Sequence, residues 1–341
     1  MTLPTEDAFD RLPKVELHVH LEGSIPLPTL WQLVEKYRGT NGLAAPQTLA
    51  ELEAKFAYRD FPHFIDTWVW KNQFIREADD FRLIAAAVAR DFARQRIRYA
   101  EVIFSPSDFY RTGVSIQAIT EAVRSGLDEV QGVRIQLVAD LVRDMGPNRS
   151  GKTLSALAEV LDRGVVGITL GGSEHRYPPE PYAEVYHRAR QLGLRTSAHA
   201  GEAAGAASIW GALNALEVDR LGHATRIAED PELFEVLAAR GVAVEACPIS
   251  NLRTGAIPNL DAHPLRELLA ASVVTSVNTD DPAMFHTSLA AEYRALSQTF
   301  GFELSDIAAL IQNAVASSWL DEADKLALSE ALRAEPGWPR P

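Results

Sequence analysis

The sequence predicts an α/β fold, a (β/α)8 TIM barrel, because eight short apolar segments rich in β-branched residues alternate with helical stretches. Several of these segments are almost continuously apolar, as is typical of parallel strands that are covered on both faces. An open, doubly wound sheet is the alternative, but no glycine-rich phosphate loop follows the first predicted strand. The predicted strands are residues 15–21, 97–104, 133–141, 165–170, 195–199, 220–223, 242–247 and 273–278.

Helical periodicity fills the connections between these strands. Residues 116–130 read IQAITEAVRSGLDEV, with apolar residues at steps of three and four. Past Ser288 we expect the eighth crossover helix and then two extra C-terminal helices, 304–320 and 322–333. The other predicted helices are residues 154–161, 182–192, 209–216, 231–239 and 265–270.

The connection after the first strand, residues 29–91, is too long for a simple crossover and is interpreted as a helical insertion. Its aromatic residues suit a lid over a barrel mouth, or equally a helical cap with its own small core, and the two are compatible. We therefore expect one domain, 1–341, with 29–91 as a helical lid. The aromatic residues are Phe56, Tyr58, Phe61, Phe64, Trp68, Trp70 and Phe74.

Composition narrows the classes of partner. The 341 residues carry a formal net charge of -13 without an evident basic stripe, which disfavours nucleic acid and anionic membranes as partners. A single cysteine, Cys247, excludes disulfides within the chain and fits a reducing compartment. We see no secretory signal and no apolar run long enough to span a bilayer, so we expect a cytoplasmic protein. The oligomeric state stays open.

Polar residues gather at the ends of four predicted strands. Residues two apart on a strand point to the same face, so the two imidazoles of His18-Val19-His20 enter the same space. Each group alone is a weak signal, but the carboxyl ends of barrel strands converge on one mouth, which makes their coincidence informative. The residues at these strand ends are His18, His20, His199, Glu202, His223, Asp280 and Asp281.

Three imidazoles and one carboxylate suit zinc, which in catalytic sites activates a water molecule. Glu202, three residues past His199, is placed to move a proton without being a ligand. Asp281 and His223 could hydrogen-bond the zinc-bound hydroxide or take the proton of the water. We predict one Zn²⁺ per chain, held by His18, His20, His199 and Asp280.

Four motifs resemble the adenosine deaminase family of the amidohydrolase superfamily: KVELHVHLEGS (14–24), AHAGE (198–202), RLGH (220–223) and VNTDDP (277–282). The resemblance extends from about residue 10 to 325. It implies that Glu202 protonates purine N1, and that His223 and Asp281 orient the hydroxide that attacks C6. It also implies that the backbone amide of Gly172 binds purine N3. The expected substrate contacts are Glu22, Gly172, His20 and Asp281.

The motifs specify the reaction more closely than the substrate. Glu22 stands where many adenosine deaminases have an aspartate that touches the ribose, and Thr169 and Ser173 also replace common aspartates. The Gly171-Gly172 pair nevertheless favours nucleoside deaminases. We predict zinc-dependent deamination of adenosine or 2′-deoxyadenosine, with a 5′-modified adenosine (6-aminodeoxyfutalosine or methylthioadenosine) or adenine as alternatives.

Two more distant interpretations are a different zinc amidohydrolase and a non-catalytic barrel. Many two-metal hydrolases carry a carboxylated lysine at the end of strand four, and residues 167–172 contain no lysine, which favours a single metal. Loss of catalysis should damage the metal set or its acid, and every expected polar group is present. The non-catalytic interpretation therefore ranks last.

Overall fold

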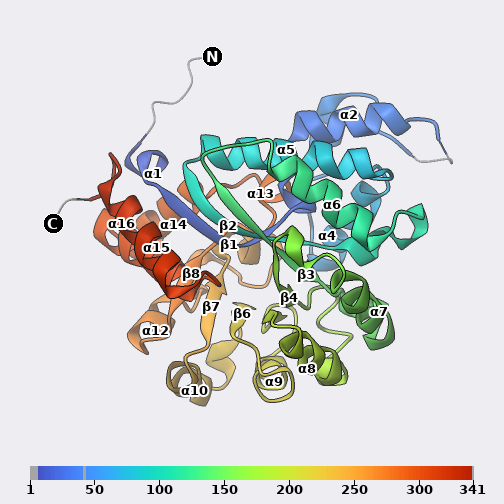
Figure 1. Ribbon diagram of the computed structural model, residues 1–341. Coiled ribbons are helices and arrows are strands. Elements are labelled where there is room, and N and C mark those ends of the chain that lie inside the picture. Colours follow the sequence, from blue (N-terminus) through green and yellow to red (C-terminus); the bar gives the residue numbers. More distant parts are fainter. Residues whose placement is uncertain (1–6, 41–43, 340–341) are drawn as a thin grey trace.

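The computed structural model describes residues 7–40 and 44–339, and its centre is an eight-stranded parallel barrel surrounded by helices (Figure 1). All eight predicted strands are present and pair in chain order, which confirms the predicted fold class. The strands are β1 (Lys14–His20), β2 (Ile97–Phe104), β3 (Arg134–Asp140), β4 (Val165–Thr169), β5 (Arg195–Ala200), β6 (Arg220–His223), β7 (Ala243–Ala246) and β8 (Thr275–Val277).

The barrel closes between β8 and β1 through residues that follow the short β8. The Asn278 side chain, rather than its backbone, accepts hydrogen bonds from the amides of Leu17 (2.8 Å) and His18 (3.2 Å). Asp280 then donates its amide to His18 O (3.0 Å) and accepts from His20 N (2.8 Å). The strand predicted for 273–278 is shorter in the structure: it begins at Thr275 and ends at Val277, where the side chain of Asn278 replaces backbone pairing with β1. The same bonds hold the start and end of the barrel together at its mouth.

Helices cover the outside of the barrel. The predicted helix 154–161 begins earlier and ends earlier, at Pro147–Leu157, because Gly146-Pro147 starts it and its first turns are polar. The C-terminal helices α15 (Leu304–Ser317) and α16 (Glu322–Ala334) are present as predicted, and α15 packs against β8 and β1. The other helices of the ring are α6 (Ile116–Leu127), α7 (Pro147–Leu157), α8 (Ala183–Gln191), α9 (Ala206–Gly211), α10 (Glu232–Arg240), α12 (Leu265–Ala270) and α14 (Leu289–Phe300); α1 (Ala8–Arg11), α11 (Pro248–Arg253) and α13 (Pro282–Phe285) are short.

The connection from β1 to β2 is helical, as predicted. It forms α2 (Leu27–Tyr37), α3 (Leu49–Ala54), α4 (Phe61–Asn72) and α5 (Ala78–Arg94). The long helix α5 packs against α6 and β2, so it belongs to the ring around the barrel, whereas α4 lines the mouth. The ends of the predicted domain 1–341, and residues 41–43 of the predicted insertion 29–91, lie outside the described residues. Within residues 7–40 and 44–339, no helix is both long and apolar enough to cross a membrane.

Candidate active site

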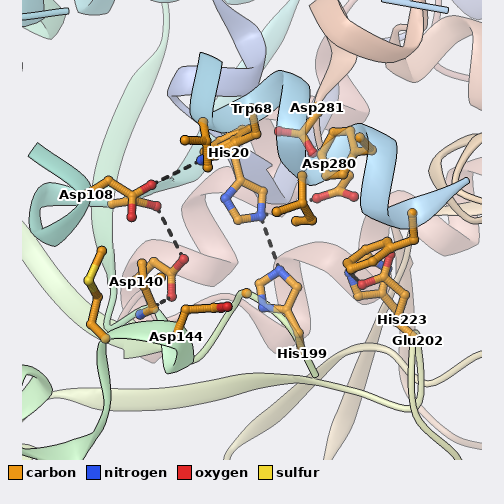
Figure 2. A pocket seen from close by; sticks show the side chains of 18 residues that line it. His20, Trp68, Asp108, Asp140, Asp144, His199, Glu202, His223, Asp280 and Asp281 are labelled. Atoms are coloured by element: carbon orange, nitrogen blue, oxygen red, sulfur yellow. Dashed lines mark hydrogen bonds and ion pairs between the residues drawn. The ribbon is translucent and has the colours of Figure 1, made fainter. Parts of the chain in front are cut away.

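Four side chains that the sequence places at strand ends meet at the mouth of the barrel. His199 Nε2, from β5, lies 3.1 Å from His18 Nε2 and 3.1 Å from His20 Nε2, both on β1. Asp280 Oδ1 lies 3.5 Å from His18 Nε2 and 3.3 Å from His20 Nε2. Figure 2 shows the rings of His20 and His199 pointing at one another, with Asp280 beside them. All four side chains are buried.

The spacing of these atoms fits a metal ion. Ligands about 2.0–2.1 Å from a tetrahedral zinc ion lie about 3.3–3.4 Å from one another, which matches the observed separations. Without a cation, three buried ring nitrogens would face each other, and those that carry no proton would have no donor to bind. A second combination, in which His223 takes the place of His20, also brings its ligand atoms within 4.8 Å of one another.

A buried chain of charges stands behind His18. His18 Nδ1 lies 2.8 Å from Glu245 Oε2, and Glu245 Oε1 lies 2.6 Å from Arg220 Nε. Arg220 Nη2 in turn pairs with Glu101 Oε2 at 2.5 Å. A carboxylate on the second ring nitrogen orients a metal-binding histidine and makes it a better ligand. Although burial lowers the pKa of His18, hydrogen bonds with Asp280 and Glu245 raise it to about 10, so this position favours positive charge.

His223 and Asp281 each present a polar atom without a hydrogen bond beside the four predicted ligands. Within the described residues, His223 Nε2 and Asp281 Oδ1 are buried and have no hydrogen-bond partner. The Asn251 amide nitrogen lies 3.1 Å from His223 Nδ1 and, by donating to it, would leave the ring proton on Nε2. His223 and Asp280 both have left-handed backbone, with φ of 67° and 62°, a rare conformation that concentrates at functional sites.

Gly23 allows Asp281 to lie where it does. A Cβ at Gly23 would fall 1.7 Å from Asp281 Oδ1 and 2.7 Å from its Cβ, so only glycine leaves room for this carboxylate. Gly23 belongs to the HLEGS part of the first motif, and Asp281 follows β8. Two distant segments therefore depend on each other sterically.

Glu202 lies on a loop that another carboxylate organises. Glu174 accepts four backbone N–H groups in a row, from residues 201 to 204, at 2.6–3.0 Å. This holds the Glu202 carboxylate with Oε2 at 3.5 Å from His223 Nε2 (Figure 2). Burial, together with the nearby carboxylates of Asp280 and Glu174, raises the pKa of Glu202 well above its ordinary value. The site therefore favours a protonated carboxyl group here, able to donate to a ligand.

A cavity of about 180 Å³ opens over this cluster. Its outer wall is apolar and comes from α4, with Phe61, Phe64 and Trp68 among its members. The lining also includes Gly172, whose φ of +97° is a left-handed conformation. The aromatic residues of the insertion thus divide: Phe61, Phe64 and Trp68 line the cavity, while Phe74 is fully buried in the core.

One predicted substrate contact lies elsewhere. Glu22 is not among the residues that line the cavity; it is 1% exposed, and its Oε1 accepts from Ser105 N at 3.0 Å. Its carbonyl accepts from the buried Lys71 of α4 at 2.7 Å. The cavity is bounded on that side by Asp108 and Asp144 instead. In this arrangement Glu22 connects α4 to the end of β1, and its Oε2 is buried without a hydrogen-bond partner among the described residues.

Sequence reasoning assigned no role to Glu245, Glu174, Asn251 or Ser250, which donates to Asp280 Oδ2 at 2.6 Å. Glu245 had a detectable signal, since it is a charged residue inside an otherwise apolar predicted strand. The contacts of the other three depend on how distant loops pack together, which the sequence does not display.

Comparisons with known proteins agree with this geometry. An aminodeoxyfutalosine deaminase from Streptomyces avermitilis is 34% identical over 326 residues, covering 94% of this chain and 90% of that protein. The crystal structure of an adenine deaminase from Arthrobacter aurescens is 31% identical with a TM-score of 0.86, covering 94% of this chain and 98% of that one. An amidohydrolase from Burkholderia ambifaria, solved with bound Zn, is 26% identical with a TM-score of 0.86, covering 97% and 93%.

The family itself is established by the extent of the match. A family model described as adenosine deaminase matches residues 13–335, a span that contains all eight strands and both C-terminal helices. The resemblance carried by the four motifs is thereby confirmed. The chain belongs to the adenosine deaminase family.

Proposed function

We propose that this protein binds one Zn²⁺ through His18, His20, His199 and Asp280 and hydrolyses the C6 amino group of adenosine or 2′-deoxyadenosine, releasing ammonia. The observation that carries the proposal is that His199 Nε2 and Asp280 Oδ1 each lie 3.1–3.5 Å from the Nε2 atoms of both His18 and His20, beside the cavity. The zinc-bearing relative and the similarity to purine deaminases support the choice of metal and reaction.

When bound, zinc supplies a water molecule that is acidic enough to act as a nucleophile near neutral pH. Around it, each residue of the chain has a separate task. His223 Nε2, which has no protein hydrogen-bond partner in the described residues, is free to hydrogen-bond the attacking oxygen. Asp281 Oδ1 offers an acceptor on the other side and can take the proton of that water.

Glu202 provides the acid. In its protonated form it donates to N1 of the purine, which makes C6 more electrophilic. The water oxygen bonds to C6, and the amino group gains the proton that Asp281 took from the water. The C6–N bond then breaks, ammonia leaves, and the remaining hydroxyl proton returns to Glu202 as the C6 carbonyl forms. Glu174, by holding the backbone of residues 201–204, keeps this carboxyl group in place.

The walls of the cavity orient the purine. The aromatic face of α4, with Phe61, Phe64 and Trp68, suits a flat heterocycle. The backbone at Gly172 can approach the opposite edge of the ring closely, because no side chain stands in the way. The insertion 29–91 thus acts, through α4, as the cover over the substrate.

A 5′-modified adenosine is the second candidate substrate. Two observations favour it: Glu22 does not reach the cavity to bind an unmodified ribose, and a further groove opens next to the cavity. The similarity to an aminodeoxyfutalosine deaminase points the same way. Similarity to an adenine deaminase keeps the free base as a third possibility.

The test is deamination by the purified, zinc-loaded protein, followed by ammonia release and mass spectrometry of the product. We expect about one zinc per chain and conversion of adenosine to inosine. His199→Ala should lose both metal and turnover. The matched control His187→Ala changes an exposed histidine of α8 that contacts Gln191, and it should keep both. Full zinc occupancy with no turnover of any 6-aminopurine would overturn the proposal.

A further inference from the structure

A buried lysine stands behind the aromatic wall of the cavity. Lys71 lies in the last turn of α4 and is only 1% exposed, yet it is not among the described residues that line the cavity. Lysine is almost never buried to this extent unless its ammonium group is paired, because removing that charge from water is unfavourable. The contacts that compensate for this burial join α4 to the barrel.

The hydrogen bonds of Lys71 reach the ends of two neighbouring strands. Its Nζ donates to Glu22 O at 2.7 Å, directly after β1, and to Asn72 Oδ1 at 2.9 Å. Asn72 Nδ2 in turn lies 3.4 Å from Asp108 Oδ2, in the segment Pro106–Thr112 that follows β2. A charged donor makes a stronger hydrogen bond than a neutral one. Lys71 therefore fastens the end of α4 to the mouth of the barrel.

The charge of Lys71 is balanced by carboxylates from three strand ends. Burial lowers the pKa of the Lys71 ammonium to about 8, although the charges of Glu22, Asp281 and Asp108 act in the opposite direction. These acidic residues follow β1, β8 and β2, whereas Lys71 belongs to the insertion. Movement of α4 away from the mouth would separate a buried cation from these partners, and that separation is unfavourable where the dielectric constant is low.

Lys71 also holds Trp68 in place. Its Nζ lies 4.3 Å from the centroid of the Trp68 ring, which is a cation–π contact. On its other sides, the Trp68 ring donates from Nε1 to Asp108 Oδ2 at 3.1 Å and meets the ring of His20 edge-on, with centroids 5.7 Å apart. Trp68 and His20 both line the cavity, and Figure 2 shows them side by side. Lys71 thus supports a wall of the cavity from behind.

Resting on the proposed deaminase function, we infer that Lys71 is a positioning residue, which fastens α4 over the mouth and holds Trp68 against His20, so that the aromatic wall is formed before the purine enters. A wall that is already in place needs little ordering when the substrate binds. Lys71 does not line the cavity, so it acts on the substrate through Trp68. Its loss should therefore weaken substrate binding more than the chemical step, which depends on Glu202, His223 and Asp281.

The first test replaces the ammonium group. Lys71→Met keeps an apolar stem but loses a charged hydrogen bond and the cation–π contact. We expect KM for adenosine to rise about 10-fold or more while kcat stays within about threefold, and the amides of α4 to exchange faster with deuterium. Lys55→Met is the matched control: the exposed Lys55 lies 5.4 Å from the centroid of Trp70 in the same insertion, and neither belongs to the described lining of the cavity. It should change neither quantity.

Two further variants assign the effect to Trp68. Trp68→Phe loses the hydrogen bond with Asp108 and weakens the contact with Lys71, so it should raise KM. If Lys71 acts through Trp68, the double variant Lys71→Met/Trp68→Phe should raise KM by less than the product of the two single effects. Asn72→Ala removes one acceptor of Lys71 and keeps the ammonium group. It should raise KM about threefold and speed exchange in α4, which tests the inference even where Lys71→Met does not fold.

Three results would overturn this inference. The first is native KM and native exchange of α4 in Lys71→Met, or in Asn72→Ala where Lys71→Met does not fold. The second is an equal rise in KM for Lys55→Met, and the third is a double variant whose KM is the full product of the single effects. A native protein that deaminates no 6-aminopurine would instead refute the deaminase function, and deuterium exchange would still decide whether Lys71 holds α4.

Discussion

Replacing Glu245 with glutamine tests how much its negative charge contributes to zinc affinity, separately from its contribution to the stability of the fold. In the native protein, Glu245 holds His18 Nδ1 at 2.8 Å and pairs with Arg220 at 2.6 Å. Glutamine keeps the shape but removes the negative charge that makes His18 a stronger ligand. Loss of such an outer-sphere carboxylate typically costs 10–100-fold in metal affinity, which is about 1.4–2.8 kcal/mol. We expect the zinc dissociation constant to rise by that factor.

Glu101→Gln is the matched control. Glu101 pairs with the other side of Arg220 at 2.5 Å and is just as buried, but it touches no predicted ligand. Both variants break a buried ion pair with Arg220, so urea unfolding should show each destabilised by about 3–5 kcal/mol. Competition with a chromophoric chelator measures zinc affinity at the same time. The reasoning is refuted if Glu101→Gln weakens zinc binding as much as Glu245→Gln, or if Glu245→Gln binds zinc like the native protein.

Three further predictions address catalysis, packing and pH. Glu202→Gln should retain zinc yet lower kcat by about 10²–10⁴-fold, measured by single-turnover deamination with metal analysis; an unchanged kcat would remove Glu202 as the acid. Gly23→Ala should displace Asp281, because the new Cβ would lie 1.7 Å from its Oδ1, and so lower kcat with zinc retained; native activity would contradict this steric dependence of Asp281 on Gly23. Burial raises the pKa of Glu292 from 4.5 to about 8, so the folded state binds a proton that the unfolded chain has released, and stability falls as pH rises from about 4.5 to about 8. Urea unfolding across that range should show that the free energy of unfolding falls less steeply with pH for Glu292→Gln than for the native protein. Equal slopes for the two proteins would show that Glu292 does not cause this pH dependence.

The barrel was predictable because its strands carry a local signal. Parallel strands that are covered on both faces must be apolar along their whole length, so eight such segments stand out in the sequence. Element ends were less predictable. The early end of β8 depends on Asn278 bonding to Leu17 and His18 of β1, a contact between opposite ends of the chain.

The residues of the candidate site also include some that the sequence could predict and some whose surroundings it could not. His18, His20, His199 and Asp280 could be named because barrel topology brings the ends of all strands to one mouth. Glu22 shows the limit of that argument, since its place in the motif indicates a ligand contact while its carboxylate bonds to Ser105. The direction of a side chain at a strand end is decided by its neighbours in space.

By itself, the sequence determined that this protein is a parallel barrel with residue types that suit a metal ion at its mouth, because the apolar strand pattern and the residue types at strand ends are local properties. Only the tertiary structure decided which groups support that chemistry. Glu245 behind His18, Glu174 under the Glu202 loop, and Lys71 of α4 at the end of β1 all join segments far apart in the chain. Such contacts depend on the register and packing of whole elements, and no local pattern in the sequence encodes them.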